Sequence, residues 1–311
     1  MQKQALRADL LMLLTAMIWG SGFVAQTSGM AHIGPYLFTG LRFALGSLCL
    51  LPLILRRPSS AKAAKPEPFM TRNLLLGGLV MGLALAAGIN LQQVGLLFTS
   101  VTNAGFITGL YVIVVPLLGL LMGHKTGMGT WLGAGMAVAG MFLLSVGDNF
   151  HVATGDWLQL IGAFVWGGHV ILVSLFASRH DPIRLAFLQF VTCSVVSLII
   201  ALFFEDIHMQ SIIAAGPALL YGGVVAVGVG YTLQVIAQKN AIASHAAIIL
   251  SLEAVFAAIA GALMLNESLH LKGYLGCALM LTGMILAQLW PKKPEPSVKM
   301  LHPAMARERK N

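Results

Sequence analysis

Ten long apolar stretches dominate this chain, and each has the length of a helix that crosses a membrane. A helix needs roughly 20 apolar residues to cross about 30 Å of hydrocarbon. The connections between the stretches are short, apart from a segment rich in proline and lysine at about residues 56–73. The stretches cover about residues 8–27, 35–55, 74–97, 101–122, 128–147, 155–177, 183–204, 211–237, 244–265 and 271–290.

The composition is typical of a protein surrounded by lipid. Of the 311 residues, 58% are hydrophobic and 10% are charged, whereas a soluble domain has about 45–50% apolar and about 25% charged residues. This balance excludes a water-soluble globular enzyme, a disordered protein and a coiled coil. The stretches are also continuously apolar, without the alternation of a transmembrane β-barrel. We therefore predict an all-α integral membrane protein with ten transmembrane helices.

The two halves of the sequence resemble each other at an offset of 142–147 residues. Each half holds five spans, so the second copy must enter the membrane from the opposite side, as in transporters built from inverted repeats. We predict two five-helix inverted repeats, at residues 1–147 and 148–290, and a disordered basic cytoplasmic tail at 291–311. The matching segments are Ala16–Gly20 with Ala163–Gly167, Pro35, Arg42 and Phe43 with Pro182, Gln189 and Phe190, Leu91–Gln92 with Leu233–Gln234, and Trp131–Met141 with Tyr274–Met284.

These residues resemble the EamA-domain proteins of the drug/metabolite transporter superfamily. The resemblance implies export or exchange of small metabolites across the cytoplasmic (inner) membrane of a bacterium, without naming a substrate. The family often has a proline where this chain has Ala254, so no proline kink is expected there. The resemblance extends over about residues 8–290, and the motifs that carry it are Trp19-Gly20-Ser21, Arg42-Phe43, Leu252–Phe256 and Leu265–Leu269, followed by Gly276 and Gly283-Met284.

Two charged residues lie inside the predicted spans, where a charge costs at least about 2.5–3.5 kcal/mol. At 1.5 Å per residue, Arg42 lies roughly 10 Å from the outer end of its helix and Glu253 roughly 13 Å from the inner end of its own. Their levels in the membrane then differ by only about 7 Å. Either residue could face a substrate path, and Glu253 could carry a coupling proton. Alternatively the two form a structural pair, or the Arg42 side chain extends outward toward the membrane surface, and for Arg42 the structural interpretation is favoured.

Aromatic and amide side chains add further candidates for a site. Trp19 and Trp166 lie near the middle of their spans, too deep for an interfacial aromatic belt, so each could line a cavity or pack in the core. Tyr111 corresponds to Glu253 in the repeat. Residues that could contact a ligand, although such residues more often join helices, are Asn90, Gln93, His169, Tyr231 and Gln234.

Glycines spaced seven apart place small residues on one face of the fifth and tenth spans. Such faces allow close helix packing, and a homodimer through these two spans is a further interpretation. The glycines are Gly133 and Gly140, and Gly276 and Gly283.

A carrier for a small metabolite that works by alternating access is the leading functional hypothesis. A flippase for a lipid-linked molecule is the alternative within the same superfamily. A membrane-embedded enzyme is disfavoured, because neither an HExxH motif nor a GxSxG motif occurs. We predict no metal site and no cofactor, since the three cysteines lie in separate apolar stretches and no histidine is near them in sequence: Cys49, Cys193 and Cys277.

The positions of the cations predict the orientation in the membrane. If the connections alternate sides, the side that carries both termini holds 17 Lys and Arg residues, and the other side holds only Lys272. Cytoplasmic loops carry the excess of Lys and Arg, so both termini are predicted to be cytoplasmic. The formal charge of +8 therefore reflects membrane orientation, and no nucleic acid partner is implied.

Cysteine-accessibility labelling tests this orientation. Cysteines placed at Lys62 and Met300 should react with a membrane-impermeant reagent only from the inside, and a cysteine at Phe150 only from the outside, because of the charge asymmetry described above. Labelling of position 62 from the outside of intact cells would contradict the predicted topology.

Overall fold

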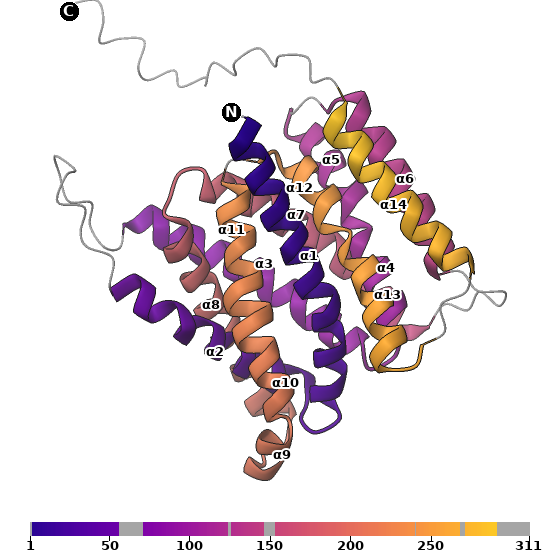
Figure 1. Ribbon diagram of the computed structural model, residues 1–311. Helices are drawn as coiled ribbons and strands as arrows, with labels where there is room; N and C mark the ends of the chain where they lie inside the picture. The colour runs from indigo at the N-terminus through magenta and orange to yellow at the C-terminus, as the bar shows by residue number, and fades with distance from the viewer. Residues whose placement is uncertain are drawn as a thin grey trace, which may run out of the picture.

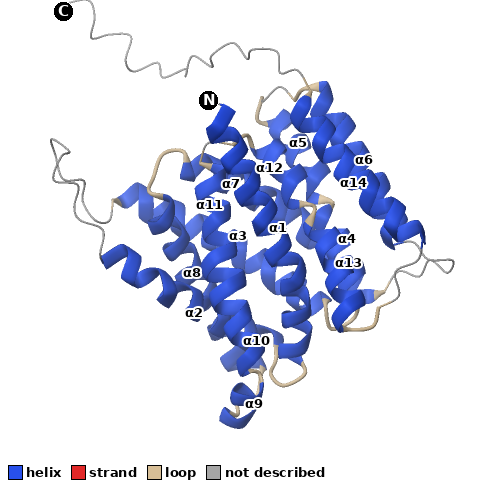
Figure 2. Ribbon diagram, in the orientation of Figure 1, coloured by secondary structure: helices blue, strands red, loops and turns tan. Residues whose placement is uncertain are grey.

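The computed structural model describes residues 2–55, 71–123, 126–145, 153–239, 241–267 and 271–290, and all regular structure in these ranges is helical (Figure 2). The segment 56–70 and the tail 291–311, on which much of the predicted charge asymmetry rests, lie outside the described residues. The first turn of α1 and the last turn of α14 lie at the same end of the molecule, at the top of Figure 1.

Eight helical segments of the described chain are long and apolar enough to cross a membrane. They match eight of the ten predicted spans. These segments are α1 (Gln2–Met30), α2 (Pro35–Leu55), α3 (Arg72–Gly95), α4 with α5 (Val101–Gly109 and Tyr111–Leu121), α7 (Thr154–Ala177), α8 (Pro182–Phe204), α10 with η1 and α11 (Gly216–Leu220, Tyr221–Tyr231 and Thr232–Gln238), and α12 with α13 (Ala243–Leu250 and Glu253–Met264).

The other two predicted spans coincide with α6 (Met128–Ser145) and α14 (Leu271–Leu289), which lie side by side at one edge of the molecule (Figure 1). The predicted glycine faces meet in this contact. A Cβ atom on Gly140 would lie 2.5 Å from the carbonyl oxygen of Gly276, and one on Gly283 would lie 2.9 Å from that of Gly133. These glycines therefore serve packing within one chain, and a homodimer through α6 and α14 would have to use their other faces.

Helices from the two halves pack on each other rather than forming separate bundles. The pairs α2 with α8, α4 with α13, and α6 with α14 are each in contact. Each pair joins a span of the first half to the span that corresponds to it in the predicted repeat. A short helix, α9 (Met209–Ala214), precedes α10 at the opposite end of the molecule from the start of α1 (Figure 1).

Within the described residues, three spans contain irregular backbone in their middle. The fourth span breaks at Leu110, between α4 and α5, and the ninth breaks at Ser251 and Leu252, between α12 and α13. The ninth span breaks without a proline, because this chain has Ala254 at the position where proline is frequent in the family that the sequence resembles. The break therefore does not depend on a proline ring. The eighth span runs as a π-helix over Tyr221–Tyr231, a geometry that is rare and often found at functional sites.

Carboxylates at one end of the bundle hold the starts of distant helices. Glu205, just after α8, accepts hydrogen bonds from the backbone N–H groups of Tyr36 (2.8 Å) and Leu37 (2.7 Å) at the start of α2. Gly34 leaves room for this carboxylate, since a Cβ there would lie 2.2 Å from Cδ of Glu205. The contact satisfies amide donors that have no partner within their own helix.

Glu267 does the same for α4. Its carboxylate accepts from the backbone N–H groups of Val101 (3.0 Å) and Thr102 (3.1 Å) and from the Thr102 hydroxyl. The preceding Asn266 has a φ of 55°, a left-handed conformation that asparagine tolerates better than most residues. Together, Glu205 and Glu267 join spans 2 and 7 and spans 4 and 9 at one end of the bundle.

Removing these carboxylates should lower the stability of the protein. We expect Glu205→Ala and Glu267→Ala each to cost about 1 kcal/mol, the typical loss when a helix loses its N-terminal cap. The melting temperature of the purified protein in detergent measures the effect, with the exposed Asp206→Asn as the matched control. An unchanged melting temperature in the double variant would show that the two contacts do not stabilise the fold.

Candidate functional site

A cavity lies in the middle of the molecule, beside the breaks in the fourth and ninth spans. Its volume is about 30 Å³, and since one water needs about 10–15 Å³, it has room for about two waters. Both halves contribute to its wall. The lining residues are Trp19, Gly22, Phe23, Gln26, Arg42, Ile89, Gln92, Thr108, Tyr111, Trp166, Val170, Ala226, Tyr231, Gln234 and Glu253.

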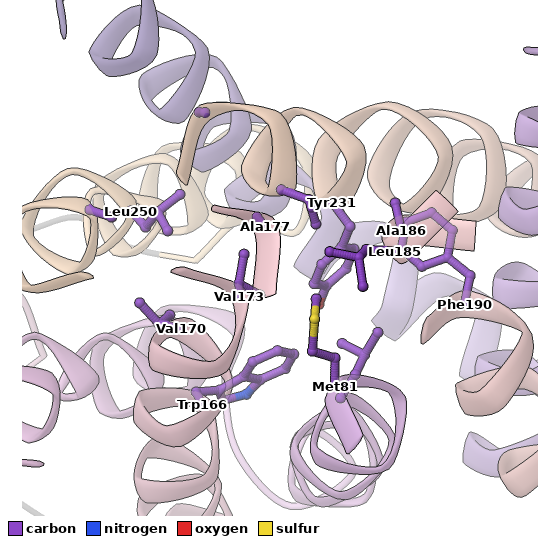
Figure 3. Close-up of a cluster of buried hydrophobic side chains, with 14 of the residues drawn as sticks. Met81, Trp166, Val170, Val173, Ala177, Leu185, Ala186, Phe190, Tyr231 and Leu250 are labelled. Carbon is purple, nitrogen blue, oxygen red and sulfur yellow. The ribbon is translucent and has the colours of Figure 1, made fainter. Parts of the chain in front are cut away.

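Aromatic rings form one wall of this cavity. Tyr231, at the end of the π-helix, lies between the two tryptophans that the repeat relates. Its ring centroid is 4.4 Å from that of Trp19 and 6.2 Å from that of Trp166, with the second pair stacked at 21°. Figure 3 shows Trp166 and Tyr231 with the core side chains Met81 and Phe190 around them. The indole N–H of Trp19 donates to the carbonyl of Ala226 (3.3 Å).

The polar atoms of this wall are only partly satisfied. The indole nitrogen of Trp166 and the Oε1 atom of Gln234 are buried and have no hydrogen-bond partner among the described residues. Buried polar groups are nearly always paired in folded proteins, so two such atoms on one cavity wall make it a candidate binding site.

Glu253 is the first residue of α13, directly after the break, and Tyr111 is the first residue of α5, directly after the other break. Both residues line the cavity. Only 4% of the Glu253 surface is exposed, and no cation forms a salt bridge with it in the described chain. A carboxyl group in such a position can bind a cationic group or take up a proton.

Arg42 lines the same cavity and is 2% exposed. Its Nη2 donates to the amide oxygens of Gln26 (3.2 Å) and Gln93 (3.2 Å). Its guanidinium also lies 5.4 Å from the ring centroids of Phe38 and Phe43. It forms no salt bridge with any acidic side chain of the described ranges, so the structural pair with Glu253 that the sequence suggested is not present.

The remaining candidates from the sequence divide into two groups. Tyr231 and Gln234 line the cavity, whereas Gln93 lies behind it and holds Arg42. His169 bonds to Gln189 across α7 and α8 (3.0 Å). Asn90 bonds to Ser197 across α3 and α8 (2.8 Å). These last two side chains join helices and do not line the cavity, although the His169 ring packs against Trp166.

Three polar lining residues are absent from the candidates named above. Gln26 accepts from both Arg42 and Gln92, and Thr108 donates to Gln159. Helical periodicity could have found Gln26, because Trp19, Gly22, Phe23 and Gln26 follow the spacing i, i+3, i+4 and i+7 and therefore share one helix face. No three His, Cys, Asp or Glu side chains come together as a metal site would require, as far as the described residues extend.

Comparisons with known proteins agree with this architecture. The chain is 31% identical over 288 residues to an uncharacterized transporter of Archaeoglobus fulgidus, covering 91% of this chain and 86% of the relative. It is 25% identical to the uncharacterized transporter YvbV of Bacillus subtilis, covering 90% of this chain and 91% of the relative. A protein of known crystal structure has the same fold, with a TM-score of 0.69, 18% identity, and coverage of 91% and 96% of the two chains.

The model of the EamA-like transporter family matches the chain twice, at residues 6–146 and 153–289. The two matches and the apolar helices make it a multi-pass membrane protein, and the family and its relatives make it a transporter. The chain therefore belongs to the EamA-like transporter family, within the drug/metabolite transporter superfamily.

Proposed function

We propose that this protein exports or exchanges a small metabolite by alternating access, with the central cavity as its binding site. The observation that carries the proposal is that positions related by the repeat meet in one cavity: Trp19 with Trp166, and Tyr111 with Glu253. In carriers built from inverted repeats, the substrate binds between the repeats near the middle of the membrane. The indoles supply apolar and stacking surface, and Glu253 binds a substrate amine or carries a coupling proton.

Alternating access also fits the size and surroundings of the cavity. Space for about two waters is too small for a metabolite, so binding requires movement of the walls. The helix breaks at Leu110 and at Ser251–Leu252 border the cavity, and hinges of this kind lie at element ends. The proposal includes ten spans as two inverted repeats of five, supported by the contacts between corresponding helices.

The proposed location is the cytoplasmic membrane of a bacterium, with both termini in the cytoplasm. The contacts of Glu205 with α2 and of Glu267 with α4 are consistent with this topology, because they join helix ends that the alternation of spans assigns to the outer side. The positions of Lys and Arg assign the opposite end to the cytoplasm.

Glu253→Gln tests the role of the cavity. Cells with and without the protein are first compared for metabolites inside and outside, and the metabolite that differs is then loaded into proteoliposomes. We expect Glu253→Gln to abolish transport or slow it strongly, since the change keeps the shape of the side chain and removes its charge. A monodisperse purified protein shows that folding is intact.

Asp206→Asn removes a carboxylate outside the cavity and should transport at the parent rate. If Glu253→Gln also transports at the parent rate across the pH range, then Glu253 is a packing residue, and neither its substrate role nor its coupling role holds.

A further inference from the structure

Arg42 carries a charge to which the described residues supply no counter-charge. A guanidinium has five N–H donors, and the described residues accept only from Nη2, through Gln26 and Gln93. Nε is buried without a partner. A buried charge is costly unless it is paired and hydrogen-bonded. The two neutral amides and the two phenyl rings around the Arg42 guanidinium replace only part of the hydration that the group would have in water.

The fold itself does not require a charge at this position. Gln189 occupies the corresponding position of the second half and is fully buried. It pairs with His169 through one hydrogen bond, and its Nε2 atom has no partner among the described residues. The second half therefore fills this position with a neutral side chain, whereas the first half places a charge there.

We propose that Arg42 binds the carboxylate group of the transported molecule. The inference rests on the proposed transport function and deepens it by naming a chemical class. The guanidinium lines the central cavity and has unused donors, and its planar fork matches a carboxylate in two parallel hydrogen bonds. The bound carboxylate supplies the counter-charge that the described residues do not, and it competes with the Gln26 amide oxygen for the guanidinium.

The other charge in the cavity selects a carboxylate over a phosphate group. Arg42 is the only Lys or Arg among the cavity-lining residues, and Glu253 is the only acid. A phosphate carries up to two negative charges near neutral pH, which one arginine would neutralise incompletely beside Glu253. A single carboxylate is neutralised by Arg42 alone, and the rings of Trp19 and Tyr231 then face the apolar body of the molecule.

Thermal stabilisation of the purified protein measures this binding without any transport step. The probes are acetate, its neutral analogue acetamide, and inorganic phosphate, each over a concentration series. The variants are Arg42→Gln, which copies the residue of the second half, Arg42→Lys, Glu253→Gln, and Arg179→Gln. Arg179 is exposed at the end of α7 and outside the cavity, so its variant controls for general salt effects.

We expect acetate to raise the melting temperature of the parent and of Arg179→Gln saturably, and acetamide to do so far less. Arg42→Gln should weaken acetate binding at least about 30-fold, as expected when one partner of a buried charge pair is removed, with Arg42→Lys intermediate. Without ligand, Arg42→Gln should melt at or above the temperature of the parent, because an unpaired buried charge has been removed. Glu253→Gln should bind acetate more tightly, because a like charge is gone.

Four results would overturn the inference. These are an acetate response in Arg42→Gln equal to that of the parent, no acetate response in the parent, a stronger response to phosphate than to acetate, and a ligand-free melting temperature of Arg42→Gln below that of the parent. Failure of Arg42→Gln to fold is the extreme case of the fourth result and overturns the inference in the same way. Transport by Glu253→Gln at the parent rate would contradict the proposed function while leaving an Arg42-dependent acetate response intact, so the two failures are distinguishable.

Discussion

Every backbone N–H and C=O group inside the hydrocarbon must find a partner in the protein, because no water is there to supply one. Irregular backbone is tolerated at that depth only where protein or a polar cavity surrounds it. The breaks at Leu110 and at Ser251–Leu252 and the π-helix over Tyr221–Tyr231 all border the central cavity. The irregular backbone and the polar side chains of the candidate site therefore lie around the same cavity.

Side chains from α1 support the irregular eighth span directly. The Trp19 indole donates to the carbonyl of Ala226, and the Thr15 hydroxyl lies 3.3 Å from the carbonyl of Gly230. Ala226 and Tyr231 are five residues apart, the spacing of a π-helical hydrogen bond, and both line the cavity. The π-helix thus changes which residues of this span face inward, and Tyr231 becomes the ring that separates the two tryptophans.

Buried polar residues fall into two classes in this fold. Asn90 and His169 bond across helix pairs outside the cavity, as expected of side chains that join transmembrane helices. Arg42 and Glu253 lie in the cavity without forming a salt bridge to each other or to any other described side chain. Groups of the second class cost stability, and such groups are typical of functional sites.

The helical membrane class could be predicted from the apolar stretches, and the family from short motifs near Trp19, Arg42 and Glu253. The depth of Arg42 and Glu253 suggested an ion pair, but depth along a helix does not fix the direction in which a side chain points. The contacts of Glu205 and Glu267 could not be predicted, because each joins segments about 165–170 residues apart in sequence. The break at Ser251–Leu252 could not be predicted either, because no proline lies next to it in the sequence.

Accessibility of the cavity from both sides of the membrane tests the central claim most directly. Ala226 lines the cavity, while Val229 of the same helix is 43% exposed. Single cysteines at these two positions therefore form a matched pair. They are introduced into a variant from which Cys49, Cys193 and Cys277 have been removed. Alternating access predicts that an impermeant thiol reagent modifies Ala226→Cys from the outside in right-side-out vesicles and from the inside in inverted vesicles, and Val229→Cys from neither side. Modification of Ala226→Cys from one side only, under all conditions, would contradict it.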